Sequence, residues 1–496
     1  MPVQIYKEVA VCFIFKFSLS RPNRPPRVAL FKRSGEVRTY RHLYAPISGS
    51  IDPKDDTPLD TAWRELREET RLDAHSLRYF RQGKPYTFTD ESIGRRWAIH
   101  PFGFMLRPNG PGDLAITLNW EHEGYAWFDI DEIQQDANFP GVPRLLESLR
   151  RVWFPIDIGY NAGDILSNGL KTLQDDHVSG ARQLATKAVD IYGDLLSKLD
   201  GSDPKIFFRQ ACIAAWHLWK NGRESMGAPI LNAMIECLTI VQNHIAGCNQ
   251  VDTNILFALM FAIPGSAKSR NEYNTSALSR HVLRLLCGDS PTRPRTRLLT
   301  LSSSSTISAA LTRVIETSTT SLDIRILESR PLFEGASLAS KLAAVSPFAA
   351  ASKPSITVYP DAGVALACKD IDFVLLGADI IDKQGNVSNK TGSLPAVLSA
   401  KYMCPSCKII VVAEKDKIMP FEPPGHEEND PRELSSAWGE HITLQSNVTL
   451  KNIYFEWAPN NLIDGYITED GRIASHDIAR LAEQVEGKAT EMFDYI

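Results

Sequence analysis

The sequence predicts an α/β protein of more than one domain, with a doubly wound parallel sheet in its C-terminal part. At 496 residues the chain is too long for one ordinary hydrophobic core. From about residue 297, short apolar runs such as "RLLTLS", "FVLLGAD" and "KIIVVAE" alternate with helical segments. Continuous apolar strands between helices are typical of a parallel sheet that helices cover on both faces.

The pattern of apolar residues divides the chain into four regions. Residues 1–150 read as short strands broken by turns, with a charged helix in the middle and a closing helix at "VPRLLESLRRVWF". Residues 151–163, around "PIDIGYNAGD", are the expected linker. Residues 164–296 carry the apolar stripes of amphipathic helices, with a loop expected at "PGSAKSRNEYNTS". Residues 297–496 hold the alternating strands and helices of the predicted sheet.

The composition describes a soluble globular protein. The chain has 43% hydrophobic residues and a formal net charge of −5, so nothing favours direct binding to nucleic acid or to a membrane. The first residues, "MPVQIYKEVAVCFIFKFSLS", alternate like a strand and lack the features of a signal peptide. No apolar run approaches the roughly 20 residues of a membrane span. Eight scattered cysteines favour a reducing compartment, and we therefore expect a cytoplasmic location.

The stretch "DDTPLDTAWRELREETRLDA" predicts a helix that begins at residue 58. Thr57 is a favourable N-cap, Pro58 takes the first helical position and Asp60 completes a variant capping box. An apolar stripe at helical spacing should face a core. Its members are Leu59, Ala62, Trp63, Leu66 and Thr70.

Three carboxylates gather on one flank of this helix. Glu65, Glu68 and Glu69 are related by i,i+3 and i,i+4 steps, so their charges repel one another unless something neutralises them. The neighbouring arginines could do so, but a hard divalent cation such as Mg²⁺ or Mn²⁺ does it better. From spacing alone, a metal site is only slightly favoured over a solvated, salt-bridged helix.

The whole stretch resembles the Nudix box, a pattern written G-x5-E-x7-R-E-U-x-E-E-x-G-U in which U is aliphatic. Gly49 opens the pattern, and Asp55 or Asp56 takes the place of its first glutamate. The run "RELREE" from Arg64 to Glu69 matches position by position. The preceding "YAPISGSI" is similar to the strand and turn that lead into the box in this family.

Features around the box both extend and limit the resemblance. The later "NWEHEGYAWFDIDEI" is similar to the family's strand that carries a further acidic residue, here Glu121 or Glu123. Arg71 stands where the family has a glycine after the paired glutamates, and the loop before Arg64 is one residue longer than the pattern. Arginine adopts the left-handed C-cap conformation less easily than glycine, but this replacement removes no metal ligand.

The Nudix resemblance implies an α/β/α sandwich over residues 1–150. It implies a hydrolase that uses Mg²⁺ or Mn²⁺ to cleave a nucleotide or another nucleoside-diphosphate-linked small molecule. The implied metal ligands are Glu65, Glu68, Glu69 and Glu121. Glu65 and Glu69 are the expected catalytic residues, with Glu65 either a ligand or the base that activates water. Gly49 and Arg64 are expected to support the box, Arg64 by orienting a carboxylate.

Polar residues also follow successive strands of the predicted C-terminal sheet. Binding sites of such sheets lie at the carboxyl ends of the strands. Ser302 begins the serine run "SSSS", Arg330 follows "DIRILES", Asp379 ends "FVLLGAD", and Asn389 and Lys390 lead into a helix. The serine run could hold an anion at a helix N-terminus, although a simple helix cap is the better interpretation from the sequence alone.

These segments carry a second resemblance, to a family with three groups of members. They are methylthioribose-1-phosphate isomerase, ribose-1,5-bisphosphate isomerase and the regulatory subunits of translation initiation factor 2B. The resemblance runs through "ESRPLFEGASLA", "LLGADIIDKQGNVSNKTGS" and "FEWAPNNLIDGYITEDG" and covers roughly residues 164–496. It implies a helical subdomain followed by a Rossmann-like subdomain. It also implies a homo-oligomer that forms through the C-terminal domain, with a sugar phosphate as ligand and initiation factor subunits as further partners.

The family's ligand-binding and catalytic positions can be carried over residue by residue. Arg223 in "RESMGAPILNA", Arg330, Asn389 and Lys390 match positions that approach phosphate, and Asp379 matches the catalytic aspartate. The catalytic cysteine of the isomerases, however, is replaced by Ser302. A serine hydroxyl exchanges a proton far less readily than a thiol. Two further departures are Glu334 in place of glutamine and Glu456 in place of aspartate.

We therefore expect a Nudix hydrolase fused to a domain that binds a phosphorylated ligand without cysteine-dependent isomerase activity. Two alternatives remain open. In one, the chain is a regulatory or translation-initiation-related protein whose Nudix fold senses a nucleotide without turnover. In the other, it is a bifunctional hydrolase and aldose–ketose isomerase.

Overall fold

The computed structural model describes most of the chain, with short gaps. The described residues are 5–18, 24–108, 116–134, 139–177, 179–288, 295–347, 353–421, 425, 427–438, 442, 444–445 and 447–496, and for 257 and 259–270 only the backbone is described. Among these residues, no helix combines the length and the apolar character needed to cross a bilayer.

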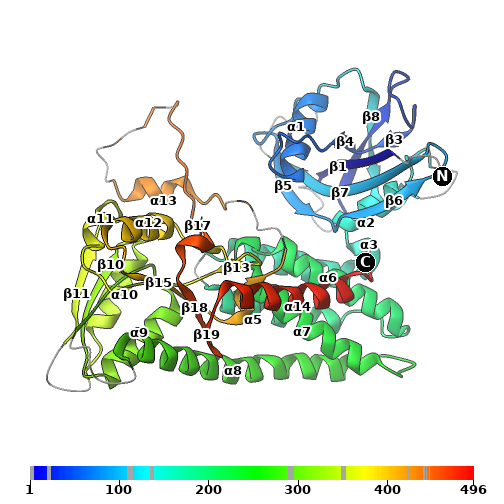
Figure 1. Cartoon of the computed structure of the whole chain (residues 1–496). Helices are drawn as coiled ribbons and strands as arrows, with labels where there is room; N and C mark the ends of the chain where they lie inside the picture. Colours follow the sequence, from blue (N-terminus) through cyan, green and yellow to red (C-terminus); the bar gives the residue numbers. More distant parts are fainter. Residues whose placement is uncertain are drawn as a thin grey trace.

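The N-terminal part is built around one mixed sheet in which β3, β2, β1, β7 and β5 lie side by side (Figure 1). Three more strands join this sheet: β4 pairs with β1, β6 with β7 and β8 with β2. The strands are β1 (Ile5–Lys16), β2 (Arg27–Arg33), β3 (Tyr44–Ala45), β4 (Ile47–Ser50), β5 (Leu77–Gln82), β6 (Tyr86–Asp90), β7 (Arg95–Leu106) and β8 (His122–Asp129).

The central strand β1 supplies the hydrophobic cores on both faces of this sheet. Alternate side chains of a strand point to opposite faces. Cys12 accordingly packs in the core that includes Leu66 of α1 (Pro58–Thr70), while Phe13 packs in the core that includes Leu149 of α2 (Leu145–Val152). One helix thus covers each face, and the predicted α/β/α sandwich is confirmed.

The middle of the chain is helical. Residues 151–163, the expected linker, hold the end of α2, the short helix α3 and the beginning of α4. The helices are α3 (Pro155–Ile158), α4 (Tyr160–Asp175), α5 (Ala181–Leu196), α6 (Pro204–Asn221), α7 (Gly227–Ile245) and α8 (Thr253–Cys287). The C-terminal helix α14 (Ser475–Phe493) returns to this region and contributes Met492 and Phe493 to its core (Figure 1).

The loop expected at 264–276 is wrong, because α8 runs unbroken from Thr253 to Cys287. The second half of the helix is held by Leu278, Val282 and Leu286, which are buried at i,i+4 spacing in a core shared with the C-terminal sheet. Burial of such a stripe stabilises a helix more than local propensity weakens it. The polar run therefore lies within a helix that is fixed by packing further along the chain.

The C-terminal sheet has the strand order β11-β10-β9-β12-β15-β18-β19 and is parallel except for its last pair. Its strands are β9 (Arg295–Leu301), β10 (Ser321–Leu327), β11 (Ser355–Tyr359), β12 (Phe373–Leu376), β15 (Lys408–Val412), β18 (Gly465–Thr468) and β19 (Gly471–Ile473). The chain builds outward from β9 in one direction and then from β12 in the other. The predicted doubly wound, Rossmann-like sheet is confirmed, and its switch point lies between β9 and β12.

Helices cover both faces of this sheet. One core contains residues of α8, α9 and α10, and the other contains residues of α11 and α12. The bounds are α9 (Ser305–Thr317), α10 (Glu334–Ala343), α11 (Val364–Ala367) and α12 (Ser393–Met403). A smaller sheet, ordered β16-β13-β14-β17, lies beyond the strand ends; it consists of β13 (Ile380–Asp382), β14 (Val387–Lys390), β16 (Ile418–Met419) and β17 (Phe455–Ala458). The short helix α13 (Pro431–Ser436) precedes β17.

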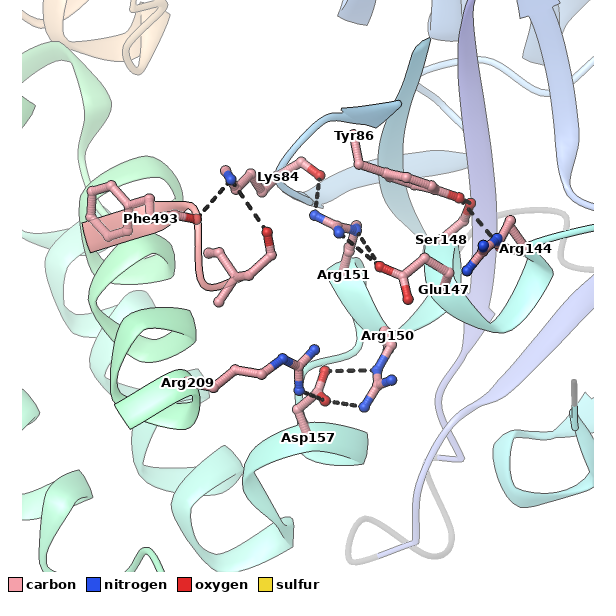
Figure 2. A network of polar contacts seen from close by, with 11 residues as sticks. Lys84, Tyr86, Arg144, Glu147, Ser148, Arg150, Arg151, Asp157, Arg209 and Phe493 are labelled. Atoms are coloured by element: carbon pink, nitrogen blue, oxygen red, sulfur yellow. Dashed lines mark hydrogen bonds and ion pairs between the residues drawn. The ribbon is translucent and has the colours of Figure 1, made fainter. Parts of the chain in front are cut away.

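The sandwich contacts the helical region through specific polar bonds (Figure 2). Lys84 Nζ donates to the backbone carbonyls of Phe493 (2.7 Å) and Ile496 (3.3 Å), while Arg151 donates to the carbonyl of Lys84 (3.0 Å). The side-chain amide of Asn221, at the end of α6, exchanges two hydrogen bonds with the backbone of Gln82 (2.7 and 2.9 Å). These bonds fix β5 and the segment after it against α6 and α14.

A buried arginine lies at the same contact. Arg81 is 3% exposed, and its guanidinium carbon lies 3.9 Å from the ring centroid of Phe80 and 4.1 Å from that of Phe154. Two of its nitrogens, Nε and Nη1, have no hydrogen-bond partner among the described residues. Aromatic faces therefore supply most of the surroundings of this cation.

Candidate functional site

The helix α1 begins as predicted. Thr57 caps it by accepting a hydrogen bond from the backbone N–H of Asp60, and Pro58 is its first residue. At the other end, Arg71 takes the left-handed conformation (φ 61°) that glycine would adopt more easily. The apolar stripe faces the sheet, so the carboxylates of α1 lie at the border between the core and the surface.

Two of these carboxylates are turned inward. Glu69 is 2% exposed, its Oε2 lies 2.5 Å from His122 Nε2, and its Oε1 has no hydrogen-bond partner among the described residues. Glu65 lies against Gly49, where a Cβ would come within 1.8 Å of the Glu65 carboxylate. Glycine is therefore required at residue 49, because any side chain would displace Glu65.

The carboxylates of Glu65, Glu69 and Glu121 form one electrostatic group, named here the carboxylate cluster. Burial raises the pKa of Glu69 well above its ordinary value, and the negative charges of Glu121 and Glu65 raise it further. Burial likewise raises the pKa of Glu65. Glu68, in contrast, has a side chain that is 58% exposed and lies 3.5 Å from Arg64. Glu68 is thus on the same helix but outside the buried group.

Arg64 and the acidic residues around it are placed by ion pairs. Arg64 donates to Glu65 (2.7 Å) and to Asp55 (3.1 and 3.2 Å), and so ties the loop before α1 to the carboxylate cluster. Glu123, the alternative to Glu121, pairs with Lys32 (3.0 Å) and His42 (2.5 Å) instead. Of the two acidic residues in that segment, Glu121 is the one whose charge acts on Glu69.

The fit of this group to a metal ion can be tested on the side chains themselves. A buried Glu69 Oε1 that lacks a partner, on a carboxylate exposed to the negative charges of Glu65 and Glu121, fits a hard divalent cation in chemistry. In the described part of the chain, however, no group of three or more His, Cys, Asp or Glu side chains already has a metal-binding arrangement. The carboxylate oxygens are suitable donors for a divalent cation, but the described side chains do not lie in a metal-binding arrangement.

An aromatic cavity of about 220 Å³ includes residues of the α2 face of the sheet in its lining and meets the carboxylate cluster at two residues. It is lined by Gly49 and Arg33, whose neighbours include Glu65 and Glu69, and by four aromatic side chains. These are Tyr40, Tyr86, Phe88 and Trp97. This cavity was not predicted from the sequence, although Tyr86 and Phe88 alternate there; in the structure they lie on β6, and Phe88 pairs with Trp97 of β7.

A larger cavity, of about 720 Å³, lies at the switch point of the C-terminal sheet and is named here the C-terminal cavity. Among the predicted residues, Arg223, Ser302, Asp379, Asn389 and Lys390 line it. Ser302 follows β9 in a left-handed conformation (φ 63°), and its N–H donates to Ser329 Oγ (2.8 Å). Burial raises the pKa of Asp379, and the nearby cations act in the opposite direction.

Two residues singled out from the sequence lie elsewhere. Arg330 is not among the described lining residues; its backbone N–H donates to Asp361, and its guanidinium lies 5.5 Å from the ring centroid of Phe333. Glu456 accepts hydrogen bonds from the N–H groups of Gly392 (2.6 Å) and Leu394 (3.0 Å). Glu456 therefore caps the beginning of α12.

Three charged lining residues of the C-terminal cavity, and a fourth charged residue that pairs with Arg223, were not predicted from the sequence. Glu414 and Lys417 line it and follow β15, so the strand-end rule could have found them. Arg182 lines it from α5 and pairs with Glu414 (3.2 Å). Glu427 pairs with Arg223 (2.7 Å) from a segment without a recognisable motif. Among the described residues, Lys417 forms no ion pair within 4.0 Å, although it is 7% exposed.

Comparison with known proteins supports both resemblances. The model of the NUDIX domain matches residues 12–150, and that of the Initiation factor 2 subunit family matches residues 278–475. Methylthioribose-1-phosphate isomerase of Chlorobaculum tepidum is 30% identical over 169 residues, which are 32% of this chain and 44% of that protein. Ribose 1,5-bisphosphate isomerase of Haloferax volcanii is 28% identical over 137 residues, 27% of this chain and 42% of that protein. The matched segment thus spans less than half the length of either relative.

Solved structures give further matches of low identity. The translation initiation factor eIF-2B of Pyrococcus horikoshii is 21% identical and covers 62% of this chain and 96% of its own, with a TM-score of 0.43. The 5-methylthioribose 1-phosphate isomerase of the same organism is 17% identical. The match covers 65% of this chain and 87% of that protein, with a TM-score of 0.46. This chain contains a NUDIX domain at residues 12–150 and a region of the Initiation factor 2 subunit family at residues 278–475.

Proposed function

We propose that the NUDIX domain hydrolyses the diphosphate linkage of a nucleoside-diphosphate-linked small molecule with the help of Mg²⁺ or Mn²⁺. The observation that carries this proposal is the carboxylate cluster, which an aromatic cavity meets at Gly49 and Arg33. The cavity offers flat aromatic faces of the kind on which a nucleobase stacks. The cluster offers hard oxygen ligands next to it.

The residues of the chain have distinct roles in this reaction. Glu69 would hold the cation with Glu121 and the exposed Glu68 as further ligands, and Glu65 is either a ligand or the base that activates water. When bound, a divalent cation offsets the charge of the diphosphate and lowers the pKa of an attacking water. Glu65, whose pKa is raised by burial, can accept the proton of that water at its carboxylate. Arg64 keeps Glu65 in place through its 2.7 Å hydrogen bond.

The substrate is oriented from the other side of the cavity. Arg33 lines the aromatic cavity and interacts with the charges of Glu69 and Glu121, so it links the cavity to the carboxylate cluster. A guanidinium there can donate charge-assisted hydrogen bonds to phosphate oxygens. Water is excluded from the inner face of the cluster by the burial of Glu69.

The test is a panel of nucleoside diphosphate sugars and dinucleotides incubated with Mg²⁺, with products identified by phosphorus NMR. We expect two monophosphates from at least one compound. Glu69→Gln should lower the rate by about 10²- to 10⁴-fold, the range typical of a lost catalytic group. The exposed Glu486→Gln of α14 is the control and should hydrolyse like the unmodified protein.

Two results of this panel would count against the proposal. Unchanged hydrolysis by Glu69→Gln would remove the carboxylate cluster from the reaction. Nucleotide binding without turnover would favour the alternative, a regulatory protein that senses a nucleotide.

We further propose that the C-terminal cavity binds a phosphorylated ligand, such as a sugar phosphate, without cysteine-dependent isomerisation. The support is the set of basic and hydroxyl groups at the switch point, with Ser302 in the place of the isomerase cysteine. Assembly as a homo-oligomer through the C-terminal domain, a cytoplasmic location and partnership with initiation factor subunits stay predictions of the sequence.

A further inference from the structure

Three of the four basic residues Arg182, Arg223, Lys390 and Lys417 of the C-terminal cavity are already paired with carboxylates of the same chain. Arg223, which is 4% exposed, donates from Nη2 and Nε to the two carboxylate oxygens of Glu427 (2.7 and 3.2 Å). Ser225 Oγ donates to the same carboxylate. The fork of an arginine on a carboxylate is the geometry with which arginine also binds a phosphate. Glu427 therefore occupies the position on Arg223 that a phosphate would take.

Lys390 is paired in the same way. Its ammonium lies 2.9 Å from Glu334 Oε1 and 4.0 Å from the ring centroid of Tyr454. Lys390 is 3% exposed, so this pair is largely removed from water. The second oxygen, Glu334 Oε2, is buried without a hydrogen-bond partner among the described residues. It is free to accept a hydrogen bond from a ligand hydroxyl.

A third cation of the cavity is paired as well, because Arg182 lies 3.2 Å from Glu414. Three cations are thus paired with Glu334, Glu414 and Glu427, whereas Lys417 forms no ion pair within 4.0 Å among the described residues. Because the ion pairs are largely buried, removing a cation from its carboxylate leaves an uncompensated charge at high cost.

We propose that Glu427 and Glu334 are specificity-determining residues that restrict the C-terminal cavity to ligands with one phosphate group and several hydroxyls. A ligand with two phosphates would have to displace carboxylates from both Arg223 and Lys390. A singly phosphorylated sugar can use the remaining donors, including Lys417 and the hydroxyls at Ser302–Ser305, while its own hydroxyls donate to the carboxylates. This inference rests on the proposed binding of a phosphorylated ligand.

The experiment is calorimetry of the full-length protein with ribose 5-phosphate and ribose 1,5-bisphosphate. For the unmodified protein we expect the monophosphate to bind at least as tightly as the bisphosphate. Glu427→Gln and Glu334→Gln keep the side-chain shape and remove the charge. Each should raise the affinity for the bisphosphate, relative to the monophosphate, by about tenfold or more, as expected for a hydrogen bond to a charged group.

Glu428→Gln is the matched control. Glu428 adjoins Glu427, but its side chain is 60% exposed and pairs with Lys451 at the surface. Its removal should leave both affinities unchanged. Thermal unfolding of each variant verifies the fold, and because Glu427 and Glu334 lie on separate segments, failure of one variant to fold leaves the other as the test.

The outcomes separate this inference from the proposed function. Tighter binding of the bisphosphate by the unmodified protein, or an unchanged affinity ratio in both variants, overturns the inference while ligand binding itself stands. Binding of neither compound to any of the proteins overturns the proposed ligand of the cavity and the inference with it. Hydrolysis by the NUDIX domain is measured separately and is unaffected by either result.

Discussion

Ser302 is the residue on which the chemistry of the C-terminal cavity depends. It follows β9, in a left-handed conformation, at the switch point of the sheet and across from Asp379. A serine hydroxyl needs a strong base to move a proton, whereas a thiol with an ordinary pKa near 8.5 needs much less. Asp379 can still accept a hydrogen bond from a ligand, so the change at residue 302 affects proton transfer more than binding.

We therefore predict that the protein does not interconvert the aldose and ketose forms of methylthioribose-1-phosphate. The compound has one phosphate and so suits a cavity in which Arg223 and Lys390 are already paired. Ser302→Cys should raise the conversion rate, because a positioned proton-transfer group contributes about 10² to 10⁴ in rate. Proton NMR of the two sugar forms measures it, with Ser303→Cys as the neighbouring control. Rapid aldose–ketose conversion by the unmodified protein would contradict this prediction and would show that the chain is bifunctional.

The site residues show what a sequence can and cannot predict. Helical spacing correctly places Glu65, Glu68 and Glu69 on one helix, but it cannot separate the exposed Glu68 from the buried Glu69. That difference arises from the sheet beneath α1 and from His122, which is 53 residues away in the chain. Arg330 also follows a strand, yet the chain turns after β10 so that its guanidinium lies over Phe333.

At the scale of elements, the contact between β5 and α6 joins the two halves of the molecule. Asn221 is 4% exposed and bonds with its side chain to both backbone groups of Gln82, as a neighbouring strand would do. Its amide also lies 2.8 Å from His217 Nδ1. Arg223, two residues after Asn221, lines the C-terminal cavity, and Tyr86, four residues after Gln82, lines the aromatic cavity. The contact therefore lies close in sequence to both cavities.

Asn221→Ala should lower the free energy of unfolding by about 1–3 kcal/mol, because it removes the side-chain partners of the partly buried backbone N–H and C=O of Gln82. Urea unfolding measures the change, and hydrogen exchange at the Gln82 amide localises it. The control is Asn161→Ala on the exposed face of α4. Equal unfolding free energies for the two variants would show that the contact contributes nothing to stability.

The elements themselves were predictable to different degrees. Apolar runs identified the strands of the C-terminal sheet, and capping residues identified the beginning of α1, because both signals are local. The unbroken α8 was missed, since its second half is fixed by Leu278 and Val282 packing against distant strands. The bond between Gln82 and Asn221 joins residues 139 positions apart and leaves no periodic pattern in the sequence.

At the scale of the whole molecule, two cavities of different chemistry occur in one chain. The aromatic cavity lies in the NUDIX domain and meets the carboxylate cluster at Gly49 and Arg33, whereas the C-terminal cavity lies at the switch point of a parallel sheet and contains paired charges. The C-terminal helix α14 returns along the helical region to meet Lys84 of the NUDIX domain (Figures 1 and 2). The two sites are thus held in one framework rather than on separate, unconnected domains.

The central claim is that the carboxylate cluster of the NUDIX domain holds the divalent cation used in hydrolysis. Its most direct test is binding of Mn²⁺, measured by electron paramagnetic resonance, to the unmodified protein and to the double variant Glu65→Gln, Glu69→Gln. We predict that the unmodified protein binds Mn²⁺ in competition with Mg²⁺, that the double variant loses this binding, and that Glu486→Gln retains it. Equal Mn²⁺ binding by the double variant and the unmodified protein would contradict the account.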